Sequence, residues 1–364
     1  MIKHIKDKVL IFRNQGIGDL ILITPAIRAI RHLHPEAHIS VFTGDWSKSS
    51  VEGNPHIYEI ISYPDPWIQN KKLFRILQLT AKLRRKRFDR VYIFHSHDIL
   101  QLLTLLSGIP ERYGFSFEGT GRFIQHKTQW EPNSQRYIAD NYLDIPRLAG
   151  YNGDDLSLEY YLSQENEAEA EGIISGNDID KDNFVVIAPG GGINPRQDVF
   201  EKRWGADKFA RLAELLHEEF DCSIILIGAK AEKEICGIVK NKSAVKVVNL
   251  CGETNFKVSA ALVKKSKMLI SNDSGIMHTA VAFKKPSAAV FGPSNPYSLL
   301  PQNNINRWVS SGIDCSPCYC NSIFKGCDRN LACMKELSAE KVFETVKELW
   351  IEQYSQIQRS HTVL

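Results

Sequence analysis

Residues 268–291 limit the fold of this chain more than any other stretch. They contain an apolar run (268–271), the turn Asn-Asp-Ser-Gly (272–275), a segment compatible with a helix, and a second apolar run (288–291). Two short apolar runs joined by a helix predict a β-α-β unit of a doubly wound parallel sheet. The polar turn then lies at the carboxyl end of a strand, which is the edge where such sheets bind ligands.

Asp273, Ser274, Gly275 and His278 are the candidate binding residues of this unit. A carboxylate in the turn can accept hydrogen bonds from sugar hydroxyls, and Ser and Gly let the backbone N–H groups of a helix start approach a phosphate. His278 follows Ser274 by four residues, so it lies one helical turn further along the same face. For a lone turn of this kind, helix capping by Asp273 or Ser274 and a half-buried His278 are the favoured interpretation, and the rest of the chain changes that.

The second half of the chain repeats this pattern. Apolar runs at 184–188, 223–227 and 245–250 each end in a glycine-containing turn and precede a helical segment, which predicts a parallel sheet with one ligand edge. Gly190, Gly191 and Gly192 directly follow a strand, where glycine weakens regular structure but lets a loop lie against phosphate. Lys202 brings a cation near the same edge. Glu232 and Thr254 follow the next two strands.

The first half begins in a similar way. An apolar strand at 9–12 leads into a loop with Gly16, Gly18 and Asp19, and Thr24 is expected to cap a helix. Ile21 stands where the dinucleotide fingerprint needs its third glycine, and no acid ends the next strand at the usual distance. A nicotinamide-dependent oxidoreductase is therefore disfavoured, although it remains an alternative. For Asp19, helix capping and proton abstraction from a substrate are both open.

Other polar residues of the first half are candidates for a second ligand. His95 and His97 follow the strand at 90–94, and we expect their side chains on opposite sides of the strand end. Residues 71–90 contain nine Lys or Arg and one Asp. Residues 71–87 are predicted to form an amphipathic helix with a cationic face, which is either solvated or in contact with a membrane surface or an anionic acceptor.

Composition and charge narrow the class of protein. The chain has 364 residues, 43% hydrophobic and 24% charged, which is typical of a globular protein with two domains. We expect domains at 1–165 and 175–335, and a last helix at 336–355 with Ser338 as its cap. No run of apolar residues is long enough for a membrane span and no signal peptide is recognised, so a cytoplasmic protein is expected. A net charge of +3 does not predict a nucleic-acid partner.

Five of the eight cysteines lie between positions 315 and 333. Cys315 and Cys318 form one C-x-x-C pair, followed by Cys327 and Cys333, and this spacing is compatible with a structural zinc or a disulfide. A four-cysteine site normally uses two such pairs and only one occurs here, so a bound metal is not predicted. A non-enzymatic binding module built on a zinc cluster is a second alternative.

The motifs taken together resemble glycosyltransferase family 9, whose best-known members are the ADP-heptose:lipopolysaccharide heptosyltransferases. The resemblance covers nearly the whole chain in order. It rests on Gly18-Asp19 with Thr24-Pro25, Pro189-Gly-Gly-Gly192, Lys202-Arg-Trp204, Gly228-x3-Glu232, Leu250-x-Gly252-x-Thr254, Asn272-Asp-Ser-Gly275-x2-His278 and Phe291-Gly-Pro-Ser-x-Pro296.

The resemblance implies an α/β GT-B fold, in which two Rossmann-like domains with parallel sheets face each other across a cleft and a last helix crosses back to the first domain. Asp19 then matches the base that deprotonates an acceptor hydroxyl for inverting transfer, and Lys202 matches the lysine on the donor diphosphate. Glu232 and Thr254 match positions near the nucleoside, and Asp273 a position near ribose or the sugar. Ser274, Gly275 and His278 match the loop and helix around the phosphates.

The implied substrates are a nucleotide sugar, ADP-heptose, and a lipid-anchored anionic saccharide such as the lipopolysaccharide core. No cofactor is implied, and peripheral contact with the inner membrane surface is expected. Gly18, His95, His97 and Arg112 are the candidate acceptor contacts. The three glycines and a long loop at 193–201 depart from the core heptosyltransferases on the donor side, so a family member with a different donor sugar is a further alternative.

Overall fold

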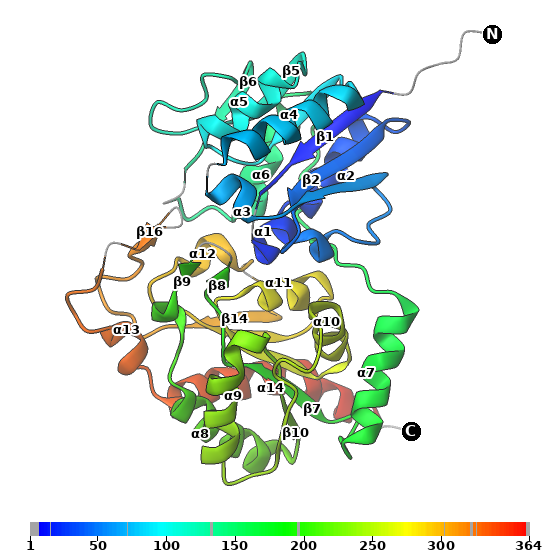
Figure 1. Ribbon diagram of the computed structural model, residues 1–364. Helices are drawn as coiled ribbons and strands as arrows, with labels where there is room; N and C mark the ends of the chain where they lie inside the picture. The colour runs from blue at the N-terminus through cyan, green and yellow to red at the C-terminus, as the bar shows by residue number, and fades with distance from the viewer. Residues whose placement is uncertain are drawn as a thin grey trace. The chain divides into compact units, whose positions relative to one another are not determined.

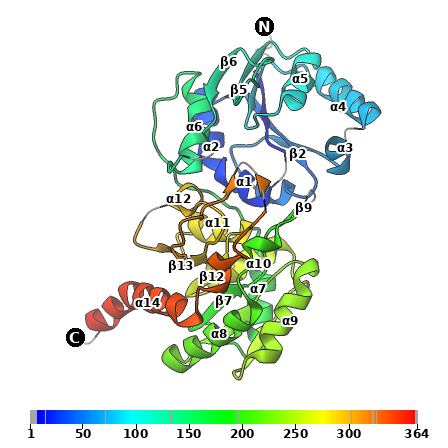
Figure 2. The same ribbon diagram turned by 90° about the vertical axis from the view of Figure 1, so that its left-hand side faces the viewer.

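The computed structural model describes residues 7–14, 16–70, 72–131, 134–194, 197–301, 303–320, 323–324 and 326–361. The chain forms two compact units, of which unit 1 ends at Tyr161 and unit 2 begins at Leu162, apart from Asn194, which clusters with unit 1. Each unit is a six-stranded sheet with helices on both faces (Figures 1 and 2). No helix among the described residues is both long and apolar enough to span a bilayer.

Unit 1 has the parallel strand order β3-β2-β1-β4-β5-β6. Its central strand β1 pairs with β2 on one side and β4 on the other, and Val9 to Phe12 are completely buried between the helical layers. Its strands are β1 Lys8–Phe12, β2 His38–Gly44, β3 Glu59–Tyr63, β4 Arg90–Ile93, β5 Glu111–Ser116 and β6 His126–Gln129. Its helices are α1 Ile17–Leu22, α2 Thr24–Leu33, α3 Pro66–Gln69, α4 Leu73–Lys86, α5 Asp98–Leu106 and α6 Ile138–Arg147.

Unit 2 has the corresponding order β11-β10-β7-β12-β13-β14, again all parallel. The sheet strands are β7 Phe184–Ala188, β10 Ser223–Leu226, β11 Val247–Asn249, β12 Met268–Asn272, β13 Ser287–Val290 and β14 Asn306–Val309. The helices are α7 Gln164–Gly176, α8 Ala206–Phe220, α9 Lys233–Lys242, α10 Phe256–Lys265, α11 Gly275–Ala282, α12 Pro296–Leu299, α13 Ala332–Lys335 and α14 Ala339–His361. Two small ribbons pair β8 Ile193–Asn194 with β9 Gln197–Asp198, and β15 Tyr319–Cys320 with β16 Ile323–Phe324.

In each sheet the order in which the chain adds its strands reverses at the centre. In unit 1 the chain proceeds outward from β1 to β3 and then restarts at β4, and in unit 2 it does the same from β7 to β11 and then β12. At such a switch point the loops after the two central strands diverge and leave a crevice for a ligand. The switch point of unit 2 lies between the loop after Ala188 and the turn after Asn272.

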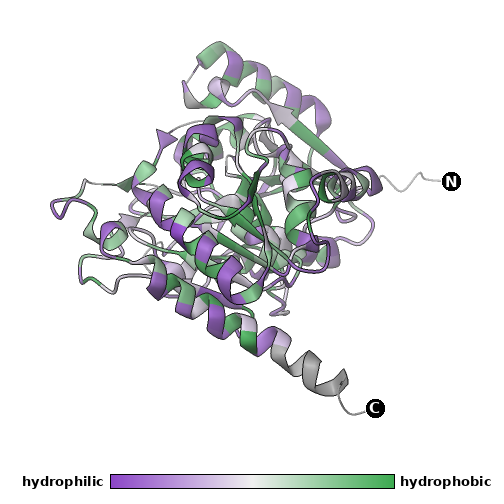
Figure 3. Ribbon diagram, turned by 90° about the horizontal axis from the view of Figure 1, so that it is seen from below, coloured by the Kyte–Doolittle hydropathy of each residue, from purple (hydrophilic) through white to green (hydrophobic). Residues whose placement is uncertain are grey.

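Two helices of unit 2 are fixed by identifiable contacts. The polar run after Ser163 forms α7, with Ser163 Oγ accepting from the backbone N–H of Asn166 (3.2 Å), and its Glu167 pairs with Lys264 of α10 (2.5 Å). The predicted cap of the last helix is confirmed, because Ser338 Oγ accepts from the N–H of Lys341 (3.2 Å). In Figure 3 the coloured part of α14 carries both hydrophobic and hydrophilic residues, and α14 packs on α8.

The prediction that Thr24 caps a helix is wrong. Helix α2 starts at Thr24 itself, and the residue before it, Ile23, makes no side-chain cap. Thr24 Oγ1 instead donates to the carbonyl of Ile21 (2.7 Å) and accepts from the N–H of Glu159 (2.9 Å). The hydroxyl thus joins α2 to a segment 135 residues later, which a local pattern cannot reveal.

Candidate active site

A loop of three glycines forms one wall of the unit 2 switch point. We call residues 189–192 the glycine loop. Asn272, the last residue of β12, is completely buried, and its Nδ2 donates to the carbonyls of Pro189 (2.8 Å) and Gly190 (2.9 Å). Its Oδ1 accepts from the N–H of Trp204 (3.1 Å). One amide therefore fixes the glycine loop, the end of β12 and the segment that carries Lys202.

Glu232 holds the glycine loop from the other side. Its Oε1 accepts from the N–H of Gly191 and its Oε2 from the N–H of Ala229 (2.6 Å), and the residue is 8% exposed. A Cβ at Gly190 would lie 2.2 Å from Glu232 Oε1, and Gly191 has a φ of +120°, so both positions need glycine. In this structure the carboxylate that the resemblance places near a nucleoside binds the protein's own backbone.

Lys202 and Asp273 form a buried ion pair at this edge. Lys202 Nζ lies 2.7 Å from Asp273 Oδ2, and the two side chains are 13% and 8% exposed. Lys202 Nζ also lies 4.2 Å from the centre of the Tyr319 ring, which suits a cation. Burial alone would raise the pKa of Asp273, but the charge and hydrogen bond of Lys202 outweigh it and lower that pKa. Asp273 is therefore held as a carboxylate.

The turn after Asp273 leads directly into the amino end of α11. Ser274 precedes the helix without capping it, and its buried Oγ has no hydrogen-bond partner in the described part of the chain. Gly275 is the first helical residue, and His278, 3% exposed, lies one turn further. A helix amino end next to a cation is an arrangement that binds anions such as a diphosphate.

Arg203 and Thr254 also lie at this edge. Arg203 Nε donates to the carbonyl of Gly191 (2.8 Å), a support for the glycine loop that sequence reasoning did not assign. Asn272 was also missed as a positioning residue, and its only signal was an amide at the end of a buried strand. Thr254 lies after β11, near the start of α10, and its Oγ1 is 2.8 Å from Ser259 Oγ. The structure therefore places Thr254 at the same edge as the glycine loop.

Asp19 occupies the corresponding edge of unit 1. It lies in the first turn of α1, and its side chain is 38% exposed. Arg13, at the end of β1, places its guanidinium 2.7 Å from Asp19 Oδ1 and lies over the ring of Tyr142. Gly16 has a φ of +81°, and a Cβ there would lie 2.1 Å from Asp19 Oδ2, so glycine leaves room for the carboxylate. Asp19 is thus held by Arg13 and still reaches solvent.

Gly18 belongs to α1, next to Asp19, and the two histidines lie after β4 at the same edge. The prediction that the side chains of His95 and His97 lie on opposite sides is wrong, because their rings stack with 5.8 Å between centroids. Residues two positions apart in an extended segment point to the same side, so the expectation applied the alternation incorrectly. His95 Nε2 is 2.7 Å from the carbonyl of Asn14, which ties it to the loop after β1.

Arg112 does not lie at this edge. It is the second residue of β5, at the amino end of the strand, whereas Asp19 and the histidines follow the carboxyl ends. Its guanidinium donates to the carbonyls of Phe123 (2.8 Å) and Ile109 (2.6 Å). The prediction that Arg112 contacts an acceptor is therefore corrected, since its donors are bound to the backbone.

The cysteine cluster contains free thiols at Cys315, Cys318, Cys327 and Cys333. Burial, together with the three neighbouring cysteines, raises the pKa of Cys333 to about 11. Within the described ranges no group of three or more His, Cys, Asp or Glu side chains is arranged to hold a metal ion. The disulfide alternative is not formed in this structure, and a structural zinc stays a prediction.

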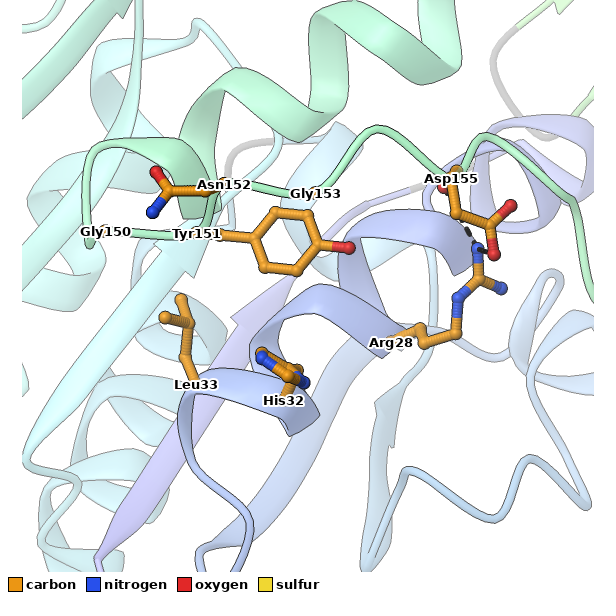
Figure 4. Close-up of a pocket in the computed structure, with 8 residues that line it drawn as sticks. All are labelled: Arg28, His32, Leu33, Gly150, Tyr151, Asn152, Gly153 and Asp155. Atoms are coloured by element: carbon orange, nitrogen blue, oxygen red, sulfur yellow. Dashed lines mark hydrogen bonds and ion pairs between the residues drawn. The ribbon is translucent and has the colours of Figure 1, made fainter.

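Unit 1 also contains a pocket of about 540 Å³ (Figure 4). It is lined by Arg28, His32, Leu33, Gly150, Tyr151, Asn152, Gly153 and Asp155. Its Arg28 is 2.9 Å from Asp155 and 2.6 Å from Glu159, so the cation is already paired. Because Leu33 ends α2 and leads toward the start of β2, the pocket lies beside the amino ends of the strands, away from the edge of Asp19.

Two doubly wound parallel sheets, each with polar residues at its switch point, define a GT-B-like glycosyltransferase fold. The structure matches that of a family 9 glycosyl transferase from Veillonella parvula with a TM-score of 0.82 at 21% identity, over 95% of this chain and 98% of the other. It matches the ADP-heptose lipopolysaccharide heptosyltransferase II of Escherichia coli with a TM-score of 0.74 at 21% identity, over 95% and 99%.

Sequence comparison agrees with the fold. The chain is 28% identical to lipopolysaccharide heptosyltransferase 2 of Escherichia coli K12 over 318 residues, which covers 83% of this chain and 87% of the relative. Residues 76–326 match the model of glycosyltransferase family 9 (heptosyltransferase). The chain belongs to this family.

Proposed function

We propose that this protein transfers a heptosyl residue from ADP-heptose to the core saccharide of lipopolysaccharide or a related lipid-anchored anionic saccharide. The observation that carries the proposal is the buried Lys202–Asp273 pair at the unit 2 switch point. A cation beside a helix amino end is what a departing nucleoside diphosphate needs. The names of the relatives add the sugar and the class of acceptor.

On the donor side, the diphosphate would bind between the glycine loop and the amino end of α11. Lys202 Nζ would share its charge between Asp273 and the phosphate, and the Ser274 hydroxyl would donate to a phosphate oxygen. Asp273 would accept hydrogen bonds from ribose or heptose hydroxyls, and Thr254 would lie near the nucleoside. Glu232 would act mainly through the glycine loop, because both of its oxygens already accept backbone hydrogen bonds.

On the acceptor side, Asp19 would be the base. The proton of an acceptor hydroxyl passes to the Asp19 carboxylate while the hydroxyl oxygen forms a bond to the anomeric carbon from the face opposite the leaving group. The bond between that carbon and the β-phosphate oxygen breaks, ADP leaves with the electron pair, and the configuration is inverted. Gly18, His95 and His97 lie at the same edge as Asp19 and would orient the acceptor.

The proposed reaction uses no metal. Lys202 and the N–H groups at the start of α11 would offset the charge that develops on the leaving diphosphate, which is the part a divalent cation plays in other transferases. Because the acceptor is anchored in lipid, we propose that the protein works at the inner face of the cytoplasmic membrane.

The test is transfer to a purified lipopolysaccharide that lacks the heptose to be added. Mass spectrometry should detect the gain of one heptose, and NMR of the product should show an anomeric configuration opposite to that of the donor. Asp19→Asn should abolish transfer and keep ADP binding by calorimetry. Asp45→Asn is the matched control, because Asp45 is an exposed carboxylate directly after β2 in the same unit. Normal turnover by Asp19→Asn would remove the assignment of the base.

A second donor sugar is the competing proposal, because three consecutive glycines at 190–192 leave the loop without side chains that could select a sugar. A thermal-shift panel of nucleotides and nucleotide sugars separates the two, since a tight ligand raises the melting temperature by mass action. A larger shift with another nucleotide sugar than with ADP-heptose would favour this alternative.

A further inference from the structure

Two helices of unit 1, α4 and α5, expose large apolar side chains to solvent. The α4–α5 patch consists of Leu73 (70% exposed), Phe74 (67%) and Leu77 (52%) of α4 with Ile99 (42%), Leu105 (37%) and Leu106 (49%) of α5. Single exposed apolar residues are normal, but a contiguous group marks an interaction surface.

The two helices are neighbours. Figure 1 shows them side by side, and Ser107 Oγ, directly after α5, donates to the carbonyl of Thr80 in α4 (3.4 Å). Both helices follow strands of the parallel sheet, so both begin at its carboxyl edge. The amino end of the patch, with Phe74 and Ile99, therefore lies on the side of unit 1 where Asp19 is found.

After Asp98 in its first turn, helix α5 exposes only apolar residues, because its Gln101 and Thr104 are buried. Leu100 and Leu103 are buried against the sheet, while Ile99, Leu105 and Leu106 point outward. A surface helix normally carries polar residues on its outer face, and one that is apolar all round is normally covered. We therefore expect a partner to cover the outer face of α5.

Charge indicates which partner. Residues 66–88 contain no Asp or Glu. The exposed cations of this stretch are Lys72, Lys82, Arg84, Arg85 and Arg87, and within the part of the chain that the structure describes none of them forms an ion pair. Arg84 lies seven positions after Leu77, and Arg85 lies eleven positions after Phe74. Residues at these spacings lie on the same face of a helix, so the cations share the outward face of the apolar residues.

An anionic membrane surface fits both properties. Apolar side chains flanked by Lys and Arg are typical of helices that lie in the lipid interface, and each cation near an anionic leaflet adds to the affinity. A second copy of this chain fits less well, because self-complementary pairing would bring two uncompensated basic faces together.

We propose that the α4–α5 patch docks unit 1 on an anionic phospholipid surface, with Phe74, Leu77 and Leu106 entering the interface and Lys82, Arg84 and Arg85 contacting lipid phosphates. This proposal deepens the proposed function, which locates the protein at a membrane, by naming the surface that binds lipid; docking itself requires neither donor nor acceptor. It also brings the Asp19 edge of unit 1 toward the layer in which a lipid-anchored acceptor is held.

The test is sedimentation of the full-length protein, without nucleotide, with vesicles of phosphatidylglycerol and phosphatidylethanolamine. The wild type should sediment with these vesicles, not with phosphatidylcholine alone, and less at high salt. F74S/L77S/L106S should lower the partition coefficient by roughly tenfold or more, since each side chain loses apolar burial. K82Q/R84Q/R85Q should lower it by roughly a hundredfold, from the loss of three cations near the surface.

The control is I238S/K240Q/K242Q, which removes an exposed apolar residue and two exposed cations from α9 of unit 2 and should leave sedimentation unchanged. Unchanged ADP binding and far-UV circular dichroism show that each variant is folded. The proposal is overturned if the wild type does not sediment with anionic vesicles, if both patch variants sediment like it, or if the patch instead mediates a dimer that F74S/L77S/L106S dissociates. Vesicle binding without heptose transfer would refute only the proposed function.

Discussion

Replacing Asn272 by Asp should disconnect the glycine loop from β12. The substitution keeps the size of the side chain and the acceptor for Trp204, but it removes the two N–H donors that reach the carbonyls of Pro189 (2.8 Å) and Gly190 (2.9 Å). A buried carbonyl left without a partner costs about 1–3 kcal/mol, so the two together cost roughly 2–6 kcal/mol. With a shift of roughly 2–4 °C per kcal/mol for a unit of this size, a value of about 4 kcal/mol lowers the melting temperature by roughly 8–16 °C.

The assay is differential scanning calorimetry with and without ADP, which identifies the transition of the nucleotide-binding unit. ADP affinity should fall as well, because the glycine loop is no longer held. Asn241→Asp makes the same chemical change at an exposed position near the end of α9 and should change stability by less than about 0.5 kcal/mol. If the two variants melt at the same temperature and bind ADP equally well, Asn272 does not organise the site.

Substitutions and conditions around this edge give three further expectations. Gly190→Ala puts a Cβ 2.2 Å from Glu232 Oε1 and should weaken ADP binding in calorimetry, whereas Gly237→Ala, whose Cβ meets nothing within 4 Å, should not; equal affinities would contradict this. The Lys202–Asp273 pair stabilises the protein above pH 3.8, the ordinary pKa of Asp273, and this contribution is lost as the pH falls through the lowered folded pKa. Lys202→Met leaves a buried charge that costs about 3–5 kcal/mol at pH 7, so its melting temperature should approach that of the wild type on acidification, and parallel curves would refute the pairing. Dialysis against EDTA should leave heptose transfer unchanged in the mass-spectrometric assay, and a loss restored by a divalent cation would refute metal independence.

Much of the fold could be predicted because it depends on local patterns. Short apolar runs predicted β1 and β4 of unit 1 and β7, β10, β11, β12 and β13 of unit 2, whereas β6 and β14 were not expected. Ser338 was correctly predicted as a cap because its partner is only three residues away. These features need only strand length, helical period and the chemistry of turns.

The errors have a different physical origin. The hydroxyl of Thr24 accepts from the backbone of Glu159, 135 residues away along the chain. Arg112 was chosen for its charge, whereas its position at the amino end of β5 decides what it contacts. Such contacts depend on how distant segments meet, and no local spacing encodes them.

The candidate site was predicted in outline and not in its working parts. Asp273, Lys202 and the three glycines were expected at one edge, and unit 2 brings them together around its switch point. The supports of that edge, Asn272 and Arg203, were not recognised. Both donate to backbone carbonyls, a role that any side chain with an N–H or O–H donor and suitable length could play, so residue type alone gives little signal.

A crystal structure of the complex with ADP is the most direct test of the donor site. We predict the β-phosphate within hydrogen-bond distance of Lys202 Nζ and of the N–H groups at the start of α11, with the glycine loop alongside. ADP bound elsewhere, for example in the pocket beside Arg28, with its phosphates out of reach of Lys202 Nζ, would contradict the account.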